Sequence, residues 1–363
     1  MKIVNRYFIK EVNTSFLAVL GVLLVIFASK HFVRYMSDAA AGELPTYMIV
    51  KLLSLFTLSA LVLMIPLALF IAILISLGRM YKDSEMTALE ACGIGIPHFM
   101  KTAGYLALFW GGLVAVIALW LGPWSEERQH EIRDEAEVEA EFSFLEAGRF
   151  HEIRDGAGVF YIEKMSANKK RMENVFVYLD DEGKVDIFSA KSGRQQIDKS
   201  NGVRYIILED GFRFEALPKD KGYRIHEYQE SGIRIAQRVI EKTEYSVAAW
   251  PTAKLLNYTG PQQIAELQWR LSMPLAVLLL TFIAVLLSRT NPRQGRFANL
   301  FLALLVFIGY MYLLMLSRSW IKSEQISPYI GMWWVHGLGV VFLLLLMVRQ
   351  FGVKWMFLGN RTK

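Results

Sequence analysis

Two pairs of cationic side chains carry the clearest chemical signal in this sequence. Lys30 and Arg34 are spaced i, i+4, and Arg318 and Lys322 repeat that spacing far along the chain. On a helix each pair places two positive charges on one face, where they can bind phosphate or carboxylate oxygens. One interpretation is a cradle for an anionic, phosphorylated amphiphile, and the other is a set of snorkelling cations. The acids that would then pair with these cations are Asp38, Glu43 and Glu324.

No residue pattern in the sequence indicates catalysis with comparable clarity. The sequence contains no G-x-x-x-x-G-K-[ST] loop to hold a nucleotide phosphate, its six histidines show no zinc-ligand spacing, and no nucleophile elbow picks out a triad. The acids from Glu126 to Glu141 are interpreted as the solvated face of a helix. We therefore predict a protein that is not an enzyme and that holds no metal or cofactor.

The composition indicates an integral membrane protein with room for one soluble insert. Of its 363 residues 54% are hydrophobic, and the mean hydropathy is +0.31. Residues 125–265 hold 21 Lys and Arg against 26 Asp and Glu, whereas the remaining residues hold 19 against 8. The basic part is interpreted as the membrane part, because basic loops are typical of the cytosolic side. The single cysteine excludes an intrachain disulfide.

Six apolar runs are long enough to form spanning helices. They cover residues 12–29, 48–77, 102–124, 271–287, 297–316 and 332–348. An amphipathic lead-in precedes the first, and Gly122-Pro123-Trp124 is expected to end the third. The loops on the side of the N-terminus carry 13 Lys and Arg against 5 on the other side, so both termini are predicted to be cytosolic. We expect a membrane half at 1–124, an outward domain at 125–265 and a second membrane half at 266–363.

The outward domain is predicted to be all-β after an initial polar helix at 125–141. Apolar and polar residues alternate over 158–165, 174–180, 185–190, 203–217 and 222–228. Turn signals, among them Ser192-Gly193, separate these segments. We expect six to eight strands in a sandwich, a jelly roll or an open barrel.

A short helix at about 83–93 is predicted inside the cytosolic loop 79–101. Asp83 or Ser84 fits its N-cap, Thr87 to Glu90 has the spacing of a capping box, and Gly93 fits its end. Its outer side would present Met86, Leu89 and Gly93, flanked by Glu85 and Glu90. This pattern favours a docking surface, and the alternative is a loop that only connects two spans.

Four motifs then resemble a known family. They are the stretch from Ser84 to Gly93, Gly122-Pro123-Trp124-Ser125, the stretch from Glu266 to Arg270, and Asn291 to Arg296. In this order, with three spans, an outward β insert and three more spans, the chain resembles the lipopolysaccharide-export permeases of the LptF/LptG type, most of all the LptF branch. The resemblance implies six transmembrane helices and a periplasmic β-jellyroll inserted between the third and the fourth.

The resemblance also implies a function. The chain would be the permease subunit of an ABC exporter that extracts lipopolysaccharide from the outer leaflet of a Gram-negative inner membrane. Its partners would be an LptG-type permease, a dimer of the cytosolic ATPase LptB, and the periplasmic bridge proteins LptC and LptA. Two alternatives stay open: a permease for another anionic envelope lipid or lipoprotein, and a membrane-anchored scaffold whose β domain recruits partners.

The same resemblance assigns roles to residues. The short cytosolic helix would be the coupling helix that enters a groove of the ATPase, with Glu85 facing a basic residue there. The coupling residues are Ser84, Glu85, Met86, Thr87, Leu89, Cys92 and Gly93. The first and fifth spans would form lateral gates, so lipid phosphates would pass Lys30, Arg34, Arg318 and Lys322. In the β domain we expect Val159, Tyr161, Phe176 and Ile206 to line or support an apolar path for acyl chains.

Overall fold

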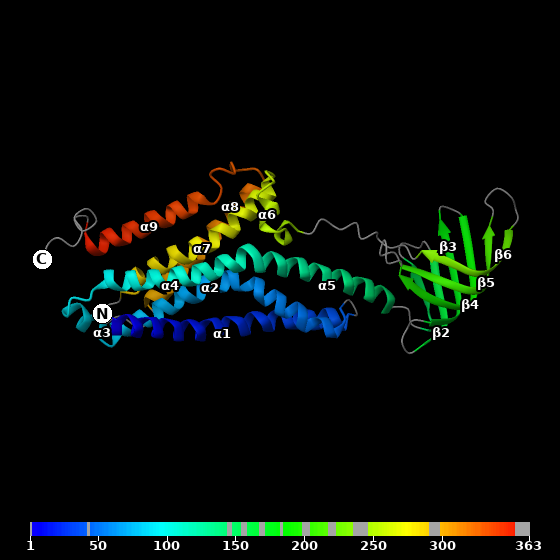
Figure 1. Ribbon diagram of the computed structural model, residues 1–363, viewed down its shortest axis with the longest axis horizontal. Coiled ribbons are helices and arrows are strands. Elements are labelled where there is room, and N and C mark those ends of the chain that lie inside the picture. Colours follow the sequence, from blue (N-terminus) through cyan, green and yellow to red (C-terminus); the bar gives the residue numbers. More distant parts are fainter. Residues whose placement is uncertain are drawn as a thin grey trace. The chain divides into compact units, whose positions relative to one another are not determined.

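Figure 1 shows the computed structural model of the chain. It describes residues 2–41, 44–143, 147–153, 158–166, 171–181, 184–197, 204–216, 223–234, 246–289 and 298–352. The chain consists of two compact units, a helical unit, Met1–Ala39, Thr46–Arg133 and Tyr245–Lys363, and a strand unit, Ala40–Pro45 and Asp134–Glu244. The strand unit is therefore shorter at both ends than the predicted domain 125–265.

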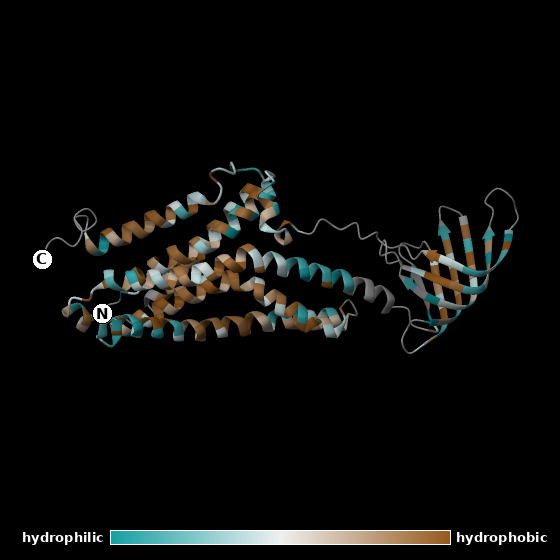
Figure 2. Ribbon diagram, viewed as in Figure 1, coloured by the Kyte–Doolittle hydropathy of each residue, from teal (hydrophilic) through white to brown (hydrophobic). Residues whose placement is uncertain are grey.

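Six of the described helices are long and apolar enough to cross a membrane, as predicted. Their elements are α1 (Lys2–Ala40), α2 (Ile49–Lys82) after the turn η1 (Thr46–Met48), α4 (Ile96–Val116), α7 (Pro261–Leu287), α8 (Ala298–Lys322) and α9 (Trp333–Phe351). Shorter elements are α3 (Glu85–Ala91), η4 (Val247–Ala249) and α6 (Thr252–Leu255). Figure 2 shows apolar residues along most of the length of the six long helices.

The six helices differ in how deeply they are buried. In their most apolar stretches, 67% of the residues of α7 and 56% of those of α2 are buried inside the protein, against 28% in α8, 11% in α9 and 6% in α1. Because α2 and α7 pack against each other and against α4, they form the centre of the bundle. The outer helices α1, α8 and α9 leave most of their apolar surface for lipid or for another protein.

The third span does not end where the sequence predicts. α4 continues through the π-helical turn η2 (Ile117–Leu121) into α5 (Gly122–Ser143), so Gly122-Pro123-Trp124 lies inside one long helix. A proline has no N–H group to donate to the carbonyl four residues earlier, which here belongs to Leu119. That carbonyl instead accepts a hydrogen bond of 2.5 Å from the Thr252 hydroxyl. The π turn and this bond from a distant residue let the helix pass the proline.

α1 also differs from the prediction. The expected amphipathic lead-in and the first span form one continuous helix of 39 residues. We use two names for the ends of the helical unit. The α3 end holds the start of α1, α3, Arg289 and Arg349, and the insert end holds Ala39, Trp124, Lys322 and Trp333.

The strand unit contains an antiparallel sheet in which each strand pairs with the next along the chain. The strands are β1 (Phe150–Ile153), β2 (Gly158–Met165), β3 (Arg171–Asp181), β4 (Lys184–Ile197), β5 (Arg204–Ala216) and β6 (Tyr223–Arg234), in the order β1-β2-β3-β4-β5-β6. β2 has its predicted bounds, and β1 was not recognised from the sequence. The turn predicted at Ser192-Gly193 is wrong, because both residues lie within β4. A jellyroll needs a second sheet, so it stays a prediction.

The side chains on one face of this sheet are buried and form a hydrophobic core. The alternation of buried and exposed residues shifts along the row that contains Asn174 and Asp210. In β5, Ile206 and Leu208 are buried, but the next buried residue is Gly211, so the alternation shifts by one at Asp210. Asp210 has a φ of 51°, and Asn174, in the same row of β3, has a φ of 49°. Asn and Asp tolerate this left-handed conformation better than other side chains. The shift keeps one face inside on both sides of this row.

Candidate transport site

An acid on another helix binds the predicted gate cation Arg318. Glu266 of α7 accepts a hydrogen bond from the Arg318 guanidinium and another from Arg270, whose Nε lies 3.0 Å from the carboxylate. The side chains of Glu266 and Arg270 are only 7% and 3% exposed. The Arg318 guanidinium also lies 4.8 Å from the centre of the Trp269 ring. One member of the cationic pair is thus neutralised inside the protein, whereas Lys322 is exposed.

The acids expected from sequence spacing do not have this role. Among the described residues, Asp38 and Glu324 form no ion pair with the gate cations, and Glu43 lies outside the described residues. Glu266 was singled out only as part of a family motif, since it lies 52 positions from Arg318 and spacing along one helix could not reveal it.

Arg270 uses its remaining donors on the segment that leads into α7. Its two terminal nitrogens lie 2.9 Å from the carbonyl oxygens of Trp250 and Ala248, and one of them lies 2.8 Å from the Thr252 hydroxyl. The same hydroxyl bonds the carbonyl of Leu119 in the π turn. Because a guanidinium has five N–H donors in a rigid plane, one side chain joins α7, this segment and the third span. Glu266 extends that network to α8.

The cationic pair on α1 has a different environment. Lys30 and Arg34 are exposed, and neither has an ion-pair partner among the described residues. Near them α1 touches α2 through aromatic rings: the His31 and Phe56 rings have centroids 3.6 Å apart, and Tyr35 is 2% exposed. The large apolar side chains on the exposed face are Leu17, Val22, Val25, Ile26, Phe32 and Val33. Within the described part of the chain, this half of α1 thus contacts α2 through rings and makes no hydrogen bond to it.

At the α3 end, α1 is fixed firmly. Phe8, Val12 and Phe16 have no exposed surface and belong to the core of the bundle. The Asn5 side-chain oxygen lies 2.5 Å from Nε2 of His98 on α4. One helix therefore has a packed, hydrogen-bonded half and a half that faces outward.

The short helix α3 begins and ends where the sequence predicts. Ser84 occupies the N-cap position, one of the two predicted, with a φ of 57°, but its side chain makes no capping hydrogen bond. The capping box predicted from Thr87 to Glu90 is wrong, because both residues lie inside the helix. At the other end Gly93 has a φ of 81°; its N–H donates to Glu90 and that of Ile94 to Leu89, both at 2.9 Å. This Schellman motif is the helix end that the glycine predicts.

The exposed side of α3 is not the one expected. Met86 is 1% exposed and lies in the core of the bundle, and Leu89 packs against that core, so both attach α3 to the other helices. From residue 84 to residue 93, the exposed residues are Ser84, Thr87, Ala88, Glu90, Ala91, Cys92 and Gly93. A partner that docks here would meet small and polar side chains.

Glu85 is linked to α1 by a chain of hydrogen bonds that the sequence did not reveal. The Tyr7 hydroxyl donates to the Glu85 carboxylate at 3.0 Å and accepts from the Arg79 guanidinium at 2.8 Å. Arg79 also lies 3.2 Å from a carboxylate oxygen of Glu11. Tyr7 and Glu11 lie one turn apart on α1, so both anchor the same face of that helix. A displacement of α3 would therefore act directly on α1.

The four expected lipid-path residues of the strand unit lie on two different faces. Ile206 is 1% exposed inside the closed core. Tyr161 and Phe176 are paired neighbours on the opposite face, and Val159 lies two residues from Tyr161 on that same face. A hollow of about 330 Å³ adjoins this second face. Its lining consists of Tyr161, Asn174, Val175, Phe176, Ser189, Ala190, Lys191, Asp210, Gly211 and Phe212.

The whole length of the chain is similar to known proteins. A family model described as "Lipopolysaccharide export system permease LptF/LptG" matches residues 6–349. The chain is 29% identical over 349 residues to the lipopolysaccharide export system permease protein LptF of Escherichia coli (strain K12), and the match covers 95% of this chain and 94% of that protein. Proteins of the same name from Escherichia coli O157:H7 and Shigella flexneri have the same identity and coverage.

Proposed function

Since the chain belongs to the LptF/LptG family of lipopolysaccharide export permeases, we propose that it is the permease subunit of an exporter that extracts lipopolysaccharide from the outer leaflet of a Gram-negative inner membrane. Its α3 end would face the cytosol and its strand unit the periplasm. The sequence has no nucleotide-phosphate loop, so we assign ATP hydrolysis to an LptB-type partner. An LptG-type permease would complete the membrane cavity, and LptC and LptA would receive the lipid.

The observation that carries this proposal is the difference between the two halves of α1. A helix that is packed and hydrogen-bonded at the cytosolic end, but rests on ring stacking at the periplasmic end, is suited to swing outward as a lateral gate. Lys30 and Arg34 would then meet the phosphates of an entering lipid. No bond within the described residues has to break for these two cations to bind an anion.

The second gate, α8, would work as a latch. Arg318 is bound to Glu266, so a lipid phosphate has to compete with that carboxylate for the guanidinium. Charge-assisted bonds to phosphate and to carboxylate are of similar strength, and the exchange therefore costs little when a phosphate is present. A lipid without phosphate offers no replacement. We propose that this competition favours a lipid that carries phosphate groups over one that carries none.

Force would enter through α3. An ATPase that moves α3 also moves Glu85, and through Tyr7 and Arg79 the motion reaches α1. The docking surface would consist of the exposed residues Thr87, Glu90, Cys92 and Gly93, with Ser84 at its start. Met86 and Leu89 would transmit the force by their attachment to the core.

The strand unit would guide the acyl chains after extraction, as a jellyroll module. One row of its second face holds the half-buried Tyr161 and Phe176 and the 46% exposed Phe212. A photo-crosslinking residue at Phe176 or Phe212 is expected to capture lipopolysaccharide during transport. Capture from Ile206 instead would mean that the closed core opens, and capture from neither face would overturn the proposed path.

The gate is tested with a photo-crosslinking amino acid in α1. Val25, 66% exposed on α1, is expected to capture lipopolysaccharide in membranes that contain the partners and ATP. Val341 of α9, 53% exposed, is the matched control on a helix without a gate role. Equal capture at the two positions would contradict a gate at α1. Capture of a different anionic lipid at Val25 alone would support the gate and change the substrate.

A further inference from the structure

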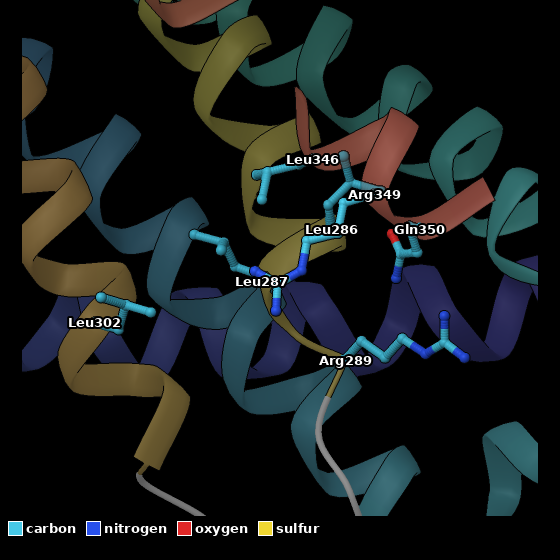
Figure 3. A pocket seen from close by; sticks show the side chains of 7 residues that line it. All are labelled: Leu286, Leu287, Arg289, Leu302, Leu346, Arg349 and Gln350. Carbon is cyan, nitrogen blue, oxygen red and sulfur yellow. The ribbon is translucent and has the colours of Figure 1, made fainter. Parts of the chain in front are cut away.

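A pocket at the α3 end of the bundle has no role in the proposed transport cycle. It lies between the ends of α7 and α9 and the beginning of α8, as Figure 3 shows, and its volume is about 290 Å³. Its lining consists of Leu286, Leu287, Arg289, Leu302, Leu346, Arg349 and Gln350. These residues come from three helices, so the pocket depends on the packed bundle and not on one loop.

The polar part of the pocket is cationic. Arg289 follows α7 and Arg349 lies in the last turn of α9, so two arginines from different helices line one cavity, and in Figure 3 their side chains extend in different directions, with the Arg349 guanidinium beside Leu287. No acidic side chain is among the described residues that line it. The side-chain oxygen of Gln350 is buried and has no hydrogen-bond partner. The pocket thus offers positive charge for an anion and, at Gln350, one acceptor for a hydroxyl or an amine.

The remaining lining is apolar. Leu302 on α8 is 55% exposed, and Leu346 lies across the pocket on α9 (Figure 3). Both helices belong to the rim of the bundle, where most of the apolar surface faces outward. In a membrane these leucines would touch acyl chains, while the arginines lie at the level of the headgroups. Basic pockets between helix ends are a common form of site for acidic lipids.

The size of the cavity limits what it can hold. Small-molecule sites usually begin at about 300 Å³, so a pocket of 290 Å³ accommodates a phosphate with a short polar group and excludes a whole lipid. Acyl chains would have to lie outside, along Leu302 and Leu346. The pocket therefore fits a molecule with a compact anionic head and an apolar tail.

We propose that this pocket binds an anionic glycerophospholipid from the leaflet at the α3 end of the bundle. The phosphate would bind the Arg349 guanidinium, with Arg289 adding a second positive charge at the border of the pocket; a headgroup hydroxyl would donate to Gln350, and the chains would follow Leu302 and Leu346. Such a lipid would connect the ends of α7, α8 and α9 and stabilise their packing. The site would hold a bound lipid at the α3 end, and the proposed gate cations lie at the insert end. A test of this site is therefore independent of a test of lipopolysaccharide export.

The test uses the purified full-length chain in detergent, with phosphatidylglycerol, phosphatidylethanolamine or glycerol phosphate added, and native mass spectrometry as the readout. We expect one phosphatidylglycerol to stay bound and neither of the other two to replace it. In the double variant Arg289→Gln/Arg349→Gln, phosphatidylglycerol binding should be about thirtyfold weaker. A basic group near a membrane surface contributes about 1 kcal/mol, so two contribute about 2 kcal/mol, and each 1.4 kcal/mol changes the binding constant about tenfold.

The matched control removes two other charges at the same end of the bundle. Lys10→Gln/Lys101→Gln changes two exposed lysines outside the pocket and should leave lipid binding unchanged. Equal loss in both double variants would mean general charge attraction and would overturn the site. Equal binding of glycerol phosphate would mean a site for free phosphate esters, and unchanged binding in Arg289→Gln/Arg349→Gln would mean that the pocket holds no lipid. Either result contradicts the proposal.

Discussion

The two helices that carry cationic pairs differ in how their insert ends are held. On α1, Lys30 and Arg34 are exposed, and the helix rests on α2 by stacked rings. On α8, Arg318 is bound to a nearly buried carboxylate that also binds Arg270. The sequence presents the two pairs as equivalent, since their spacing is identical. Their surroundings leave both cations of α1 exposed but bind Arg318, one of the two on α8, to a carboxylate.

This difference shows what each helix can contribute. Moving the insert end of α1 breaks no hydrogen bond among the described residues near it, whereas moving α8 separates Arg318 from Glu266 and leaves charges uncompensated. Breaking a buried pair costs far more than breaking an exposed one. In our account α1 therefore moves first, and α8 moves only when an anion replaces Glu266.

Removing the acid of the latch should have the largest effect. Glu266→Gln leaves the Arg270 and Arg318 guanidinium groups without a carboxylate, and loss of one partner of a buried ion pair costs about 3–5 kcal/mol. We expect a clear drop in the thermal unfolding temperature of the purified protein. Glu324→Gln removes an exposed acid just after α8 and should change that temperature very little. Equal unfolding temperatures for the two variants would mean that Glu266 does not hold α8.

The next prediction concerns the Thr252 hydroxyl, which links Arg270 to the third span. Thr252→Val removes the donor to Leu119 and the acceptor for Arg270 with little change in shape. Leaving buried polar groups unsatisfied costs about 1–3 kcal/mol. Thr57→Val is the control, since that hydroxyl bonds only a carbonyl of its own helix. If both variants unfold at the same temperature, the bond across the π turn contributes nothing.

Tyr7 tests the packed half of α1. Tyr7→Phe removes the hydroxyl between Glu85 and Arg79, and an exposed bond of this kind contributes about 0.5–1.5 kcal/mol. We expect the assembled exporter to move less lipopolysaccharide per ATP hydrolysed, with the ATPase still bound. Tyr105→Phe, which changes a 56% exposed tyrosine on α4, should keep the normal ratio. A normal ratio in Tyr7→Phe would contradict the proposed transmission from α3 to α1.

The exposed cations should matter least for stability. Lys30→Gln/Arg34→Gln removes two charges without described partners, and such surface changes usually alter stability by less than about 0.5 kcal/mol. Lipopolysaccharide captured from Val25 should nevertheless fall. A large loss of stability would show that this pair is structural, and undiminished capture would remove its role in the gate.

The sequence predicted features that depend on local pattern. Six apolar runs became six long helices, five alternating segments became β2 to β6, and Gly93 ended α3. Prediction from the sequence failed where a residue far along the chain forms the hydrogen bond or ion pair of a backbone or side-chain group. Thr252 lets the third span continue past Pro123, and Glu266 neutralises Arg318. Spacing along one element contains no information about such partners.

The sequence also could not predict which face of a short helix or strand is buried. Met86 was expected on the outer side of α3, but the direction from which the bundle contacts this helix decides which side is buried. In the strand unit the shift at Asp210 and Asn174 changes the face on which later residues lie. Alternation alone therefore could not separate Ile206 from Tyr161 and Phe176.

The most direct test of the account measures movement at both ends of α1. Spin labels at Val33 and Leu271, exposed on α1 and α7 near the insert end, report one distance, and labels at Lys10 and Lys101 report the α3 end. Cys92 is first replaced by alanine. In the exporter with its ATPase, trapping of nucleotide should change the Val33 to Leu271 distance and leave the Lys10 to Lys101 distance unchanged. Equal changes at both ends, or a change only at the α3 end, would contradict a gate that is anchored at one end.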